Sequence, residues 1–147
     1  MKILFAVAAM CSVVLFLAAS TSGNSSDPCR QVQPNADEGK CYAREQTRIN
    51  VQLDVLVSRY VSDLQHGAAI KAKDEVVADL LRKSATALAS SQASWKVYRE
   101  QYCKAVEYSY TTGSGAGIAY ESCMYELGQK RARELWVNFA EMDFRPH

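Results

Sequence analysis

Four cysteines set in two widely separated pairs constrain the fold of this chain more than any other feature. A fifth, Cys11, lies inside an apolar leader at the N-terminus. An even number of cysteines in an exported chain is most simply two disulfides, and four cysteines allow three pairings. We expect Cys29–Cys41 and Cys103–Cys123, because each of these pairings closes a short local loop. In the chain-entropy model a loop of this size contributes about 3 kcal/mol to stability.

Residues 1–22 have the pattern of a cleavable signal peptide. A positively charged start precedes an apolar run from Ile3 to Ala19, which is shorter than the ~20 residues of a membrane-spanning helix. Small side chains at Ala18 and Ser20 suit the −3 and −1 positions that signal peptidase reads. We therefore expect cleavage rather than a membrane anchor, no stable membrane insertion afterwards, and a single periplasmic or secreted domain at residues 23–147.

The charge balance excludes several classes of partner. The chain has 17 Lys and Arg residues against 16 Asp and Glu residues, and Lys2 leaves with the leader, so the mature protein is near neutral. No basic stripe indicates binding to nucleic acid, and no acidic block indicates a tail for cationic partners.

Neither a metal site nor a catalytic motif is evident. Zinc sites use closely spaced cysteines with histidines, whereas these cysteines are far apart and the only histidines are His66 and His147. The leader cysteine Cys11 follows the bulky Met10, which does not suit lipid modification. A glycosidase would need two carboxylates facing one cleft, and no sequence pattern places two together. We expect a binding protein without metal or cofactor, not an enzyme.

Apolar residues at helical spacing predict a first helix that begins near Asn35. Asp37 and Glu38 are typical of the first turn of a helix. One apolar face is formed by Ile49, Leu53, Leu56, Tyr60 and Leu64. Four further residues widen this face, so we expect packing on more than one neighbour: Val51, Val55, Val57 and Val61. His66-Gly67 is expected to end the helix, because glycine adopts the left-handed C′ conformation at little cost.

A second helix is expected from about Lys71–Asp74 to about Tyr108. Its apolar positions include Val76, Val77, Leu80, Leu81, Leu88, Trp95, Tyr98 and Tyr102. Small residues would let a neighbouring helix approach closely: Ala85, Ala87, Ala89 and Ala93. The span is long for a helix of a globular protein, so we expect a break near Ser90-Ser91.

The glycine-rich segment from Thr111 to Gly117 separates the second helix from a third, expected from about Ile118 to Ala140. No strand precedes this segment and no P-loop lysine follows it, so a turn between helices is favoured over a phosphate site. One face of the third helix carries Tyr120, Cys123, Leu127, Arg131 and Leu135, and Trp136 and Phe139 continue its apolar surface. The fold class is therefore all-α, a small antiparallel bundle of three to four helices. Cys103 and Cys123 lie symmetrically about Gly113, which supports their pairing.

The most distinctive side-chain cluster lies on the second helix: Trp95, Tyr98, Arg99, Tyr102 and Cys103. Trp95 and Arg99 are four residues apart and share a helix face. We expect Arg99 to stack on an aromatic ring or to pair with a carboxylate of another helix, such as Glu121 or Glu134. Two interpretations stay open. The cluster is either a ligand-binding surface, or a core aromatic with a structural arginine at the edge of the bundle.

The run from Gln92 to Cys103 resembles the LprI-like lysozyme inhibitor N-terminal domain family of exported bacterial proteins. The family pattern has an alanine and a tryptophan, then tyrosine-arginine, an acidic residue and a cysteine. In this chain these are Ala93, Trp95, Tyr98-Arg99, Glu100 and Cys103. The pattern continues with Gly113-Ser114-Gly115, Cys123, and the closing pair Arg131 and Leu135, and its first half resembles Cys29, Cys41 and the step from Leu56 to Tyr60. The similarity covers about residues 29–135.

Two positions depart from the family pattern. The family usually has asparagine where this chain has Val57, and threonine or serine where it has Gly128. If those polar groups bind a partner, this chain has lost or changed that contact.

The resemblance implies a protein partner, lysozyme, and protection of peptidoglycan from hydrolysis. Our candidate contact is the glycine segment with its flanking tyrosines: Tyr108, Tyr110, Gly113, Ser114 and Gly115. The alternative is a periplasmic interaction module that binds another envelope protein or peptidoglycan without inhibiting lysozyme.

Overall fold

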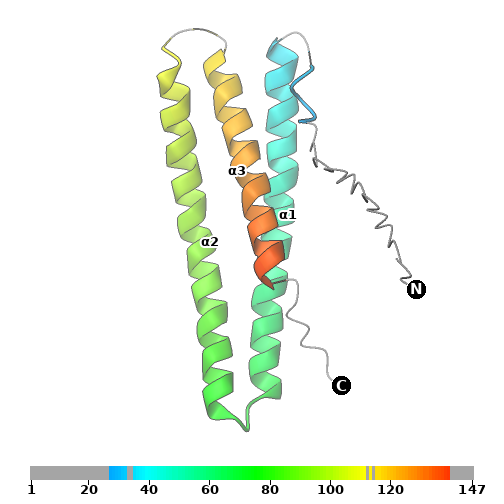
Figure 1. Ribbon diagram of the computed structural model, residues 1–147, viewed down its shortest axis with the longest axis vertical. Helices are drawn as coiled ribbons and strands as arrows, with labels where there is room; N and C mark the ends of the chain where they lie inside the picture. The colour runs from blue at the N-terminus through cyan, green and yellow to red at the C-terminus, as the bar shows by residue number, and fades with distance from the viewer. Residues whose placement is uncertain (1–26, 33–34, 112, 114, 140–147) are drawn as a thin grey trace, which may run out of the picture.

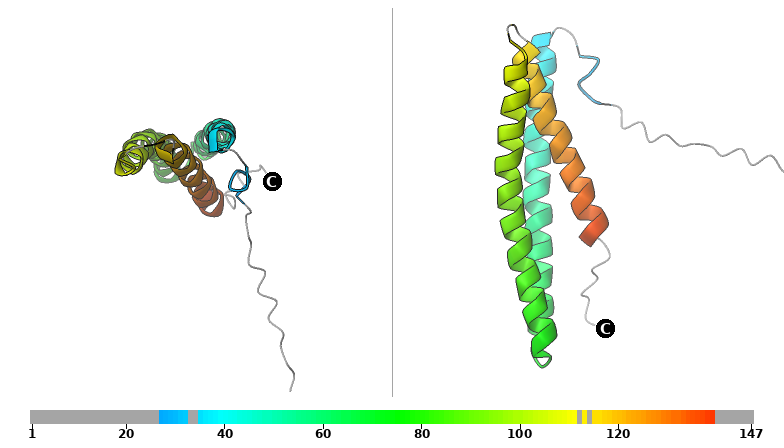
Figure 2. Two further views of the ribbon diagram at one scale, coloured as in Figure 1. Left: turned by 90° about the horizontal axis from the view of Figure 1, so that it is seen from above. Right: turned by 60° about the vertical axis from the view of Figure 1, so that its left-hand side comes forward.

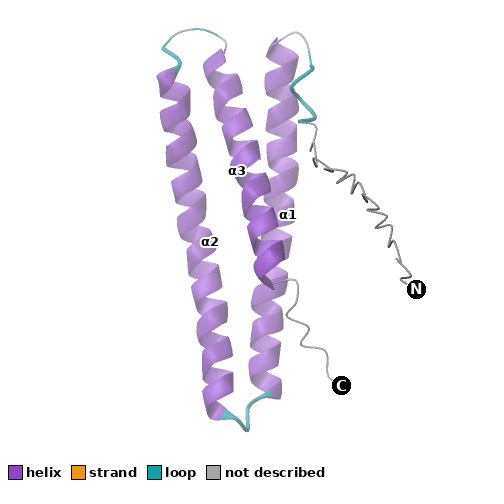
Figure 3. Ribbon diagram, in the orientation of Figure 1, coloured by secondary structure: helices purple, strands orange, loops and turns teal. Residues whose placement is uncertain are grey.

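The computed structural model describes residues 27–32, 35–111, 113 and 115–139. Every regular element in these ranges is an α-helix (Figure 3), in the order α1 (Asn35–Ile70), α2 (Glu75–Ser109) and α3 (Gly115–Phe139). The helices lie side by side, and each runs antiparallel to the next along the chain (Figure 1). The expected all-α antiparallel bundle is confirmed, with three helices. The signal peptide expected at residues 1–22 lies outside the described residues.

Helix α1 continues beyond its predicted end. It begins at Asn35, as expected, but runs through His66-Gly67 to Ile70. Gly67 is buried and helical, and its carbonyl accepts a hydrogen bond from the Lys71 amide at 3.0 Å. The helix continues because its core-facing side extends one turn further, to the buried Ala68. The prediction that Gly67 ends the helix was wrong.

Helix α2 is one unbroken helix. The Asp74 side chain caps its start by accepting a hydrogen bond from the Val77 amide at 3.2 Å, close to the expected beginning. The predicted break near Ser90-Ser91 was wrong. The Ser91 hydroxyl donates to the Leu88 carbonyl at 2.9 Å, so the serine is accommodated within the helix instead of interrupting it.

The turn before α3 is shorter than predicted. Gly113 has φ +108°, in the left-handed region that glycine adopts easily, and the expected turn is found there. Helix α3 begins at Gly115, however, not near Ile118. Gly115 and Gly117 therefore belong to the first turn of the helix.

Helix α3 is the shortest of the three and crosses the other two at an angle. Figure 2 shows it leaning away from α2 toward its C-terminal end. At that end Phe139 packs on Tyr60 of α1, with ring centroids 5.3 Å apart. Helices α1 and α2 continue past α3 as a two-helix hairpin (Figure 1). The bundle therefore has a three-helix part beside the α2–α3 turn and a two-helix part beyond it.

The apolar core follows the line where the helices face one another. Its most completely buried leucines are Leu53 and Leu64 of α1 and Leu135 of α3. Full burial of one such side chain contributes about 1.5–3 kcal/mol relative to leaving it exposed. These three leucines were expected on the apolar faces of their helices, and the structure confirms them.

The four valines predicted to widen the face of α1 divide into two pairs. Val57 is buried and Val61 packs against the core, whereas Val51 and Val55 are mostly exposed. Helix α1 does pack on both other helices. Because α2 and α3 also pack on each other, they cover adjacent parts of its surface and leave the opposite side in solvent.

The core face of α2 differs most from expectation. Tyr98 and Tyr102 are about half exposed, and three other apolar positions of this helix are also exposed, namely Val76, Val77 and Leu80. Its buried residues are instead Ala78, Ala85, Leu88, Gln92, Arg99 and Cys103. Of the four alanines thought to allow close approach, only Ala85 is buried. Helix α2 thus buries two polar side chains and leaves large aromatic ones in solvent.

Both predicted disulfides are present. Cys29–Cys41 ties the segment before α1 to the first turns of that helix, with the Cα atoms 5.6 Å apart. Cys103–Cys123 joins α2 to α3, also with a Cα separation of 5.6 Å. The second bridge lies where the antiparallel hairpin centred on Gly113 brings α2 and α3 together, as the symmetric spacing of the two cysteines about Gly113 predicted.

Gly128 lets α3 approach α1 closely. A Cβ atom built at this position would lie 2.8 Å from Cγ2 of Ile49 and 3.2 Å from Nη1 of Arg99. Both contacts are closer than van der Waals packing allows, so the residue must be small. Gly117, in the first turn of the same helix, faces open space, with no atom within 4 Å of a built Cβ.

We expect Gly128→Ala and Gly117→Ala to change stability in opposite directions. Overpacking at Gly128 should lower the free energy of unfolding by about 1–3 kcal/mol, whereas alanine at the open helical position should raise it by about 0.5–1 kcal/mol. Urea denaturation followed by circular dichroism measures both. Equal effects of the two substitutions would contradict the close approach of α3 to α1.

Candidate functional site

A cluster of buried and half-buried residues, which we call the arginine crossing, joins the three helices near the middle of α2: Asn50, Gln92, Trp95, Arg99, Gly128 and Arg131. The Arg99 guanidinium lies 4.6 Å from the centre of the Trp95 ring. The Arg131 guanidinium lies 5.9 Å from the centre of the same ring. Two cations therefore lie close to one indole, an arrangement that cation–π attraction favours.

Arg99 is buried, and no carboxylate of the described residues pairs with it. Only 5% of it is exposed, and its Nη2 donates to Oδ1 of Asn50 at 2.7 Å. Its Nε and Nη1 have no hydrogen-bond partner among the described residues. Burial accordingly lowers the pKa of the guanidinium, against the opposing influence of Tyr120, Glu100 and Asp54. The expected stacking on an aromatic ring is present, but the suggested pairing with Glu121 or Glu134 is not.

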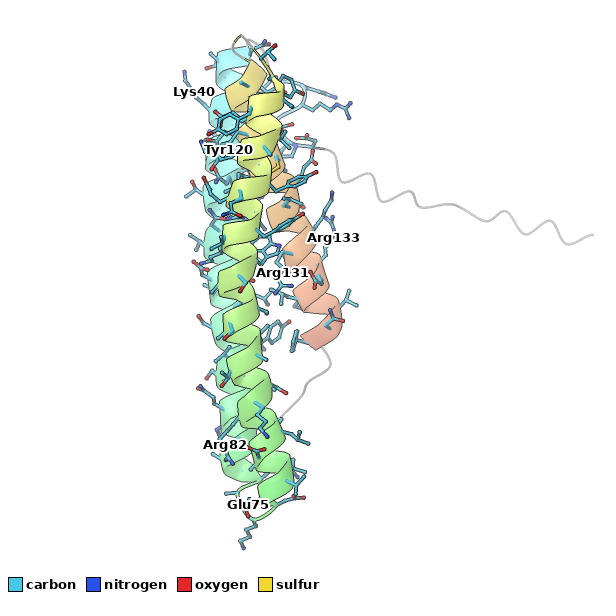
Figure 4. The ribbon with its side chains drawn as sticks, turned by 90° about the vertical axis from the view of Figure 1, so that its left-hand side faces the viewer. Lys40, Glu75, Arg82, Tyr120, Arg131 and Arg133 are labelled. Atoms are coloured by element: carbon cyan, nitrogen blue, oxygen red, sulfur yellow. A yellow bond between two sulfur atoms is a disulfide. The ribbon has the colours of Figure 1, made fainter. Side chains whose placement is uncertain are left out.

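Arg131 holds α3 to α2. Its Nε donates to Oε1 of Gln92 at 3.1 Å and its Nη2 to the Ser91 hydroxyl at 3.3 Å. Nη1 pairs with Glu134 on its own helix at 2.9 Å. Figure 4 shows Arg131 between α2 and α3. With Leu135 1% exposed one turn later, the closing arginine–leucine pair of the family pattern forms part of the helix interface.

A second cluster lies at the end of the bundle where α2 leads into α3. We call this region the loop end; it comprises α2 from Glu100 onward, the turn at Gly113, and α3 as far as Glu121. The Tyr120 hydroxyl donates to Oε2 of Glu100 at 2.7 Å. Lys104 donates to Oε2 of Glu107 at 3.1 Å and lies 4.5 Å from the centre of the Tyr120 ring. Burial, together with the bond to Glu100, raises the pKa of Tyr120 to about 12.

Glu121 is the least satisfied carboxylate of the loop end. Its Oε2 is buried and has no hydrogen-bond donor among the described residues. Burial raises the pKa of this carboxyl group, and Glu100 and Glu107 raise it further. Three carboxylates thus lie around a single ammonium group, that of Lys104, and the loop end carries a local negative charge on a near-neutral protein.

A hollow of about 830 Å³ opens beside these side chains, between the loop end and the start of α1. Glu107, Tyr120 and Glu121 line one wall, and Lys40 with neighbouring residues of α1 lines the other. Lys40 and Tyr120 are both near the same end of the bundle in Figure 4. Two of the three carboxylates, Glu107 and Glu121, therefore line the hollow, and Glu100 is exposed outside it.

The candidate contact residues are also at this end. Tyr108 and Tyr110 are exposed, and Gly113 forms the turn beside them. Gly115 lies next to the Tyr110 ring, since a Cβ atom built on this glycine would be 3.7 Å from Cδ1 of that tyrosine. Ser114 lies outside the described residues. The structure therefore brings the described candidates together with the acidic cluster, which the sequence did not connect to them.

Both departures from the family pattern lie inside the bundle. Val57 and Gly128 are buried between helices. A different residue at either position would change the packing between helices, because both positions lie inside the bundle. These departures therefore leave the exposed candidate contact intact.

Two negative findings apply to the described part of the chain. It contains no group of three His, Cys, Asp or Glu side chains positioned to hold a metal ion. No helix within it has the length and hydropathy that a membrane span requires.

Sequence reasoning missed Asn50, Gln92 and the link between Glu100 and Tyr120. Gln92 precedes Arg99 by one heptad, and this spacing was the signal that both share a buried face. Asn50 and Glu100 had no comparable signal, since their roles depend on how the helices cross.

Substitutions at Asn50 should test the buried charge of Arg99. Asn50→Ala removes the hydrogen bond to the guanidinium and should cost about 1.5–3 kcal/mol of unfolding free energy. Asn50→Asp supplies a counter-charge and should stabilise at neutral pH. The new carboxyl group would have a depressed pKa in the folded state, so its contribution is present above the unfolded value of about 3.9 and is lost as pH falls through the folded one. Denaturant titrations at pH 7 and pH 3 distinguish these effects; destabilisation by aspartate at pH 7 would contradict the assignment.

Glu121→Gln should stabilise the protein in a pH-dependent way. Because the folded pKa of Glu121 is raised, folding disfavours its ionised form. Stability present below the unfolded pKa of about 4.3 is therefore lost as pH rises through the folded value. Glutamine avoids this loss, so the gain should be larger at pH 8 than at pH 4 in thermal denaturation. A gain in stability that is independent of pH would show that folding does not disfavour the ionised form of Glu121.

Comparison with known proteins places this geometry in a family. No curated protein and no solved structure matches the chain. The family model for lysozyme inhibitor LprI matches residues 29–135, which run from the first disulfide through all three helices to the buried Leu135. The match confirms the resemblance carried by the motif from Trp95 to Cys103. The chain belongs to the lysozyme inhibitor LprI family.

Proposed function

We propose that this protein is exported to the bacterial cell envelope, binds lysozyme and protects peptidoglycan from hydrolysis. The observation that carries the proposal is the family match over residues 29–135. The two disulfides support export, because such bonds persist in oxidising compartments such as the periplasm. The role is one of binding, in keeping with an inhibitor family, and the chain itself performs no catalytic step.

The proposed contact surface is the loop end. It combines the exposed Tyr108 and Tyr110 with the turn at Gly113. Tyrosine provides a large contact area at a low cost in side-chain entropy and is enriched at protein interfaces. A narrow turn between two helices that are bridged by Cys103–Cys123 is a shape suited to entering an enzyme cleft, because little further ordering is needed on binding.

The charge of the loop end supports a basic partner. Glu100, Glu107 and Glu121 lie close enough together for the first two to raise the pKa of the third. Many animal lysozymes are basic, and opposite charge accelerates association and orients the partners. A protein that is near neutral overall can therefore still attract such an enzyme toward one end.

The central prediction is that the purified mature protein slows the lysis of bacterial cell walls by lysozyme at micromolar concentration. Tyr110→Ser should raise the inhibition constant about tenfold or more, as expected when an interface hot spot is truncated. Tyr98→Ser is a matched control, because Tyr98 and Tyr110 are 52% and 53% exposed and Tyr98 lies on α2 outside the loop end, about three helical turns before Tyr110. The control should change the constant less than twofold.

Unchanged lytic rates with several lysozyme classes would reject inhibition. A pull-down from envelope extract, together with sedimentation on peptidoglycan, then tests the alternative of an interaction module without inhibitory activity. Inhibition that is lost equally in Tyr98→Ser and Tyr110→Ser would leave the activity in place but reject the loop end as its contact surface.

A further inference from the structure

A second hollow, of about 460 Å³, lies on the side of the bundle where the segment before α1 meets α3. We call it the basic hollow. Its residues come from that segment, from α1 and from α3: Asp27, Pro28, Arg30, Arg48, Tyr125, Glu126, Gln129, Lys130 and Arg133. The segment is fixed by the Cys29–Cys41 disulfide and by a hydrogen bond from the Tyr42 hydroxyl to Asp27. The volume is within the range of small-molecule sites, about 300–1,000 Å³.

Cations predominate in this lining, and most of them lack a counter-charge. Arg48 pairs with Glu45 at 2.7 Å. Arg30 comes from the segment before α1, and Lys130 and Arg133 come from α3. None of the three forms an ion pair within the described ranges. Outside the hollow, five surface cations each have a carboxylate within 4 Å, namely Lys40, Arg59, Lys83, Lys96 and Lys104. Arg44, Lys71, Lys73 and Arg82 form no ion pair within the described residues either, so it is the gathering of cations around one cavity that distinguishes the hollow.

The two carboxylates of the basic hollow offset its cations only in part, because four cations and two carboxylates line it. Asp27 accepts hydrogen bonds from the Cys29 amide and the Tyr42 hydroxyl, neutral donors that leave its oxygens turned toward those groups. Glu126 precedes Lys130 by four residues, the spacing of a favourable helix pair, yet no ion pair forms between them. Unpaired like charges around one cavity produce a positive potential that attracts an anion.

The basic hollow also has an aromatic residue in its lining. Tyr125 is buried, its ring packs 6.0 Å from that of Tyr42, and its hydroxyl accepts a hydrogen bond from Nε2 of Gln129 at 2.6 Å. Burial raises the pKa of this phenol, Glu45 and Asp27 raise it further, and Arg48 and Arg133 oppose the rise. An anionic ligand in the hollow would therefore meet guanidinium groups and a tyrosine.

We propose that the basic hollow binds a small molecule bearing a carboxylate or phosphate group, with Arg30, Lys130 and Arg133 as its charged contacts. Arginine forms paired hydrogen bonds with such planar or tetrahedral oxyanions. Figure 4 shows Arg133 on the side of α3 away from α2. None of the proposed contact residues lines the basic hollow, although Glu126 and Lys130 also line a smaller hollow together with Tyr110. The proposal does not depend on lysozyme binding.

The test is a nuclear magnetic resonance titration of the mature protein at constant ionic strength with three probes. Inorganic phosphate represents free phosphate, N-acetylmuramic acid represents a carboxylated sugar, and N-acetylglucosamine is a neutral sugar that lacks the carboxylate. We expect saturable shifts of Gln129 and Arg133 side-chain signals with one or both anions. The neutral sugar should produce none. Whichever anion binds more tightly identifies the source of the oxyanion.

Four exposed positions sharpen the test. Lys130→Gln and Arg133→Gln should each weaken anion binding about tenfold, the loss expected when a charge-assisted hydrogen bond is removed. Glu126→Gln should tighten it, because the substitution removes the nearest unpaired negative charge. Arg82→Gln, on α2 near the opposite end of the bundle (Figure 4), is the matched control and should change nothing. Absence of shifts with both anions, equal shifts with the neutral sugar, or an equal loss in Arg82→Gln would overturn the proposal.

Discussion

The structure depends on one constraint, the close crossing of three helices around the buried guanidinium of Arg99. The charge is held by the Trp95 ring at 4.6 Å and by Asn50 of α1 at 2.7 Å. A side chain at Gly128 would collide with Ile49 and approach Nη1 of Arg99, so α3 fits only because that residue is glycine. One turn beyond Arg99, the Cys103–Cys123 bridge fixes α2 to α3. The turn that follows is therefore supported by covalent and packed contacts directly beneath it, which is what a rigid binding edge requires.

Local patterns predicted what depends on local physics. The symmetric placement of Cys103 and Cys123 about Gly113 gave the second disulfide, and apolar spacing along α1 gave Leu53 and Leu64 as core residues. The core face of α2 was predicted in part, since Leu81, Leu88 and Trp95 are in the core or pack against it; the rest was missed because apolar character was taken as the guide. That face instead repeats at heptad spacing through small and polar side chains, Ala78, Ala85, Gln92 and Arg99. Polar residues can occupy it because Arg131, Asn50 and Trp95 from the crossing contact them, and such partners depend on tertiary geometry that no single helix records.

The distribution of charge is the second feature that links structure to function. A mature chain near neutrality has carboxylates concentrated at the loop end and unpaired cations in the basic hollow. Among the residues that the structure describes, a buried oxygen of Glu121 has no hydrogen-bond donor and two buried nitrogens of Arg99 have no acceptor. Such groups lower stability, and proteins commonly retain them where function requires it. The acidic cluster of the loop end could not be located from the sequence. Glu100, Glu107 and Glu121 come together only once α2 and α3 are folded against each other.

Amide hydrogen exchange of the mature protein tests most directly whether the crossing is the stable centre of the fold. Exchange from the most protected amides reports the free energy of global unfolding. The account predicts that these amides lie where three helices pack, at residues 49–57 of α1, 92–103 of α2 and 124–135 of α3. The two-helix part, residues 61–70 and 75–85, should exchange faster. If the slowest amides lie in that two-helix part instead, the crossing around Arg99 is not the interaction on which the fold depends.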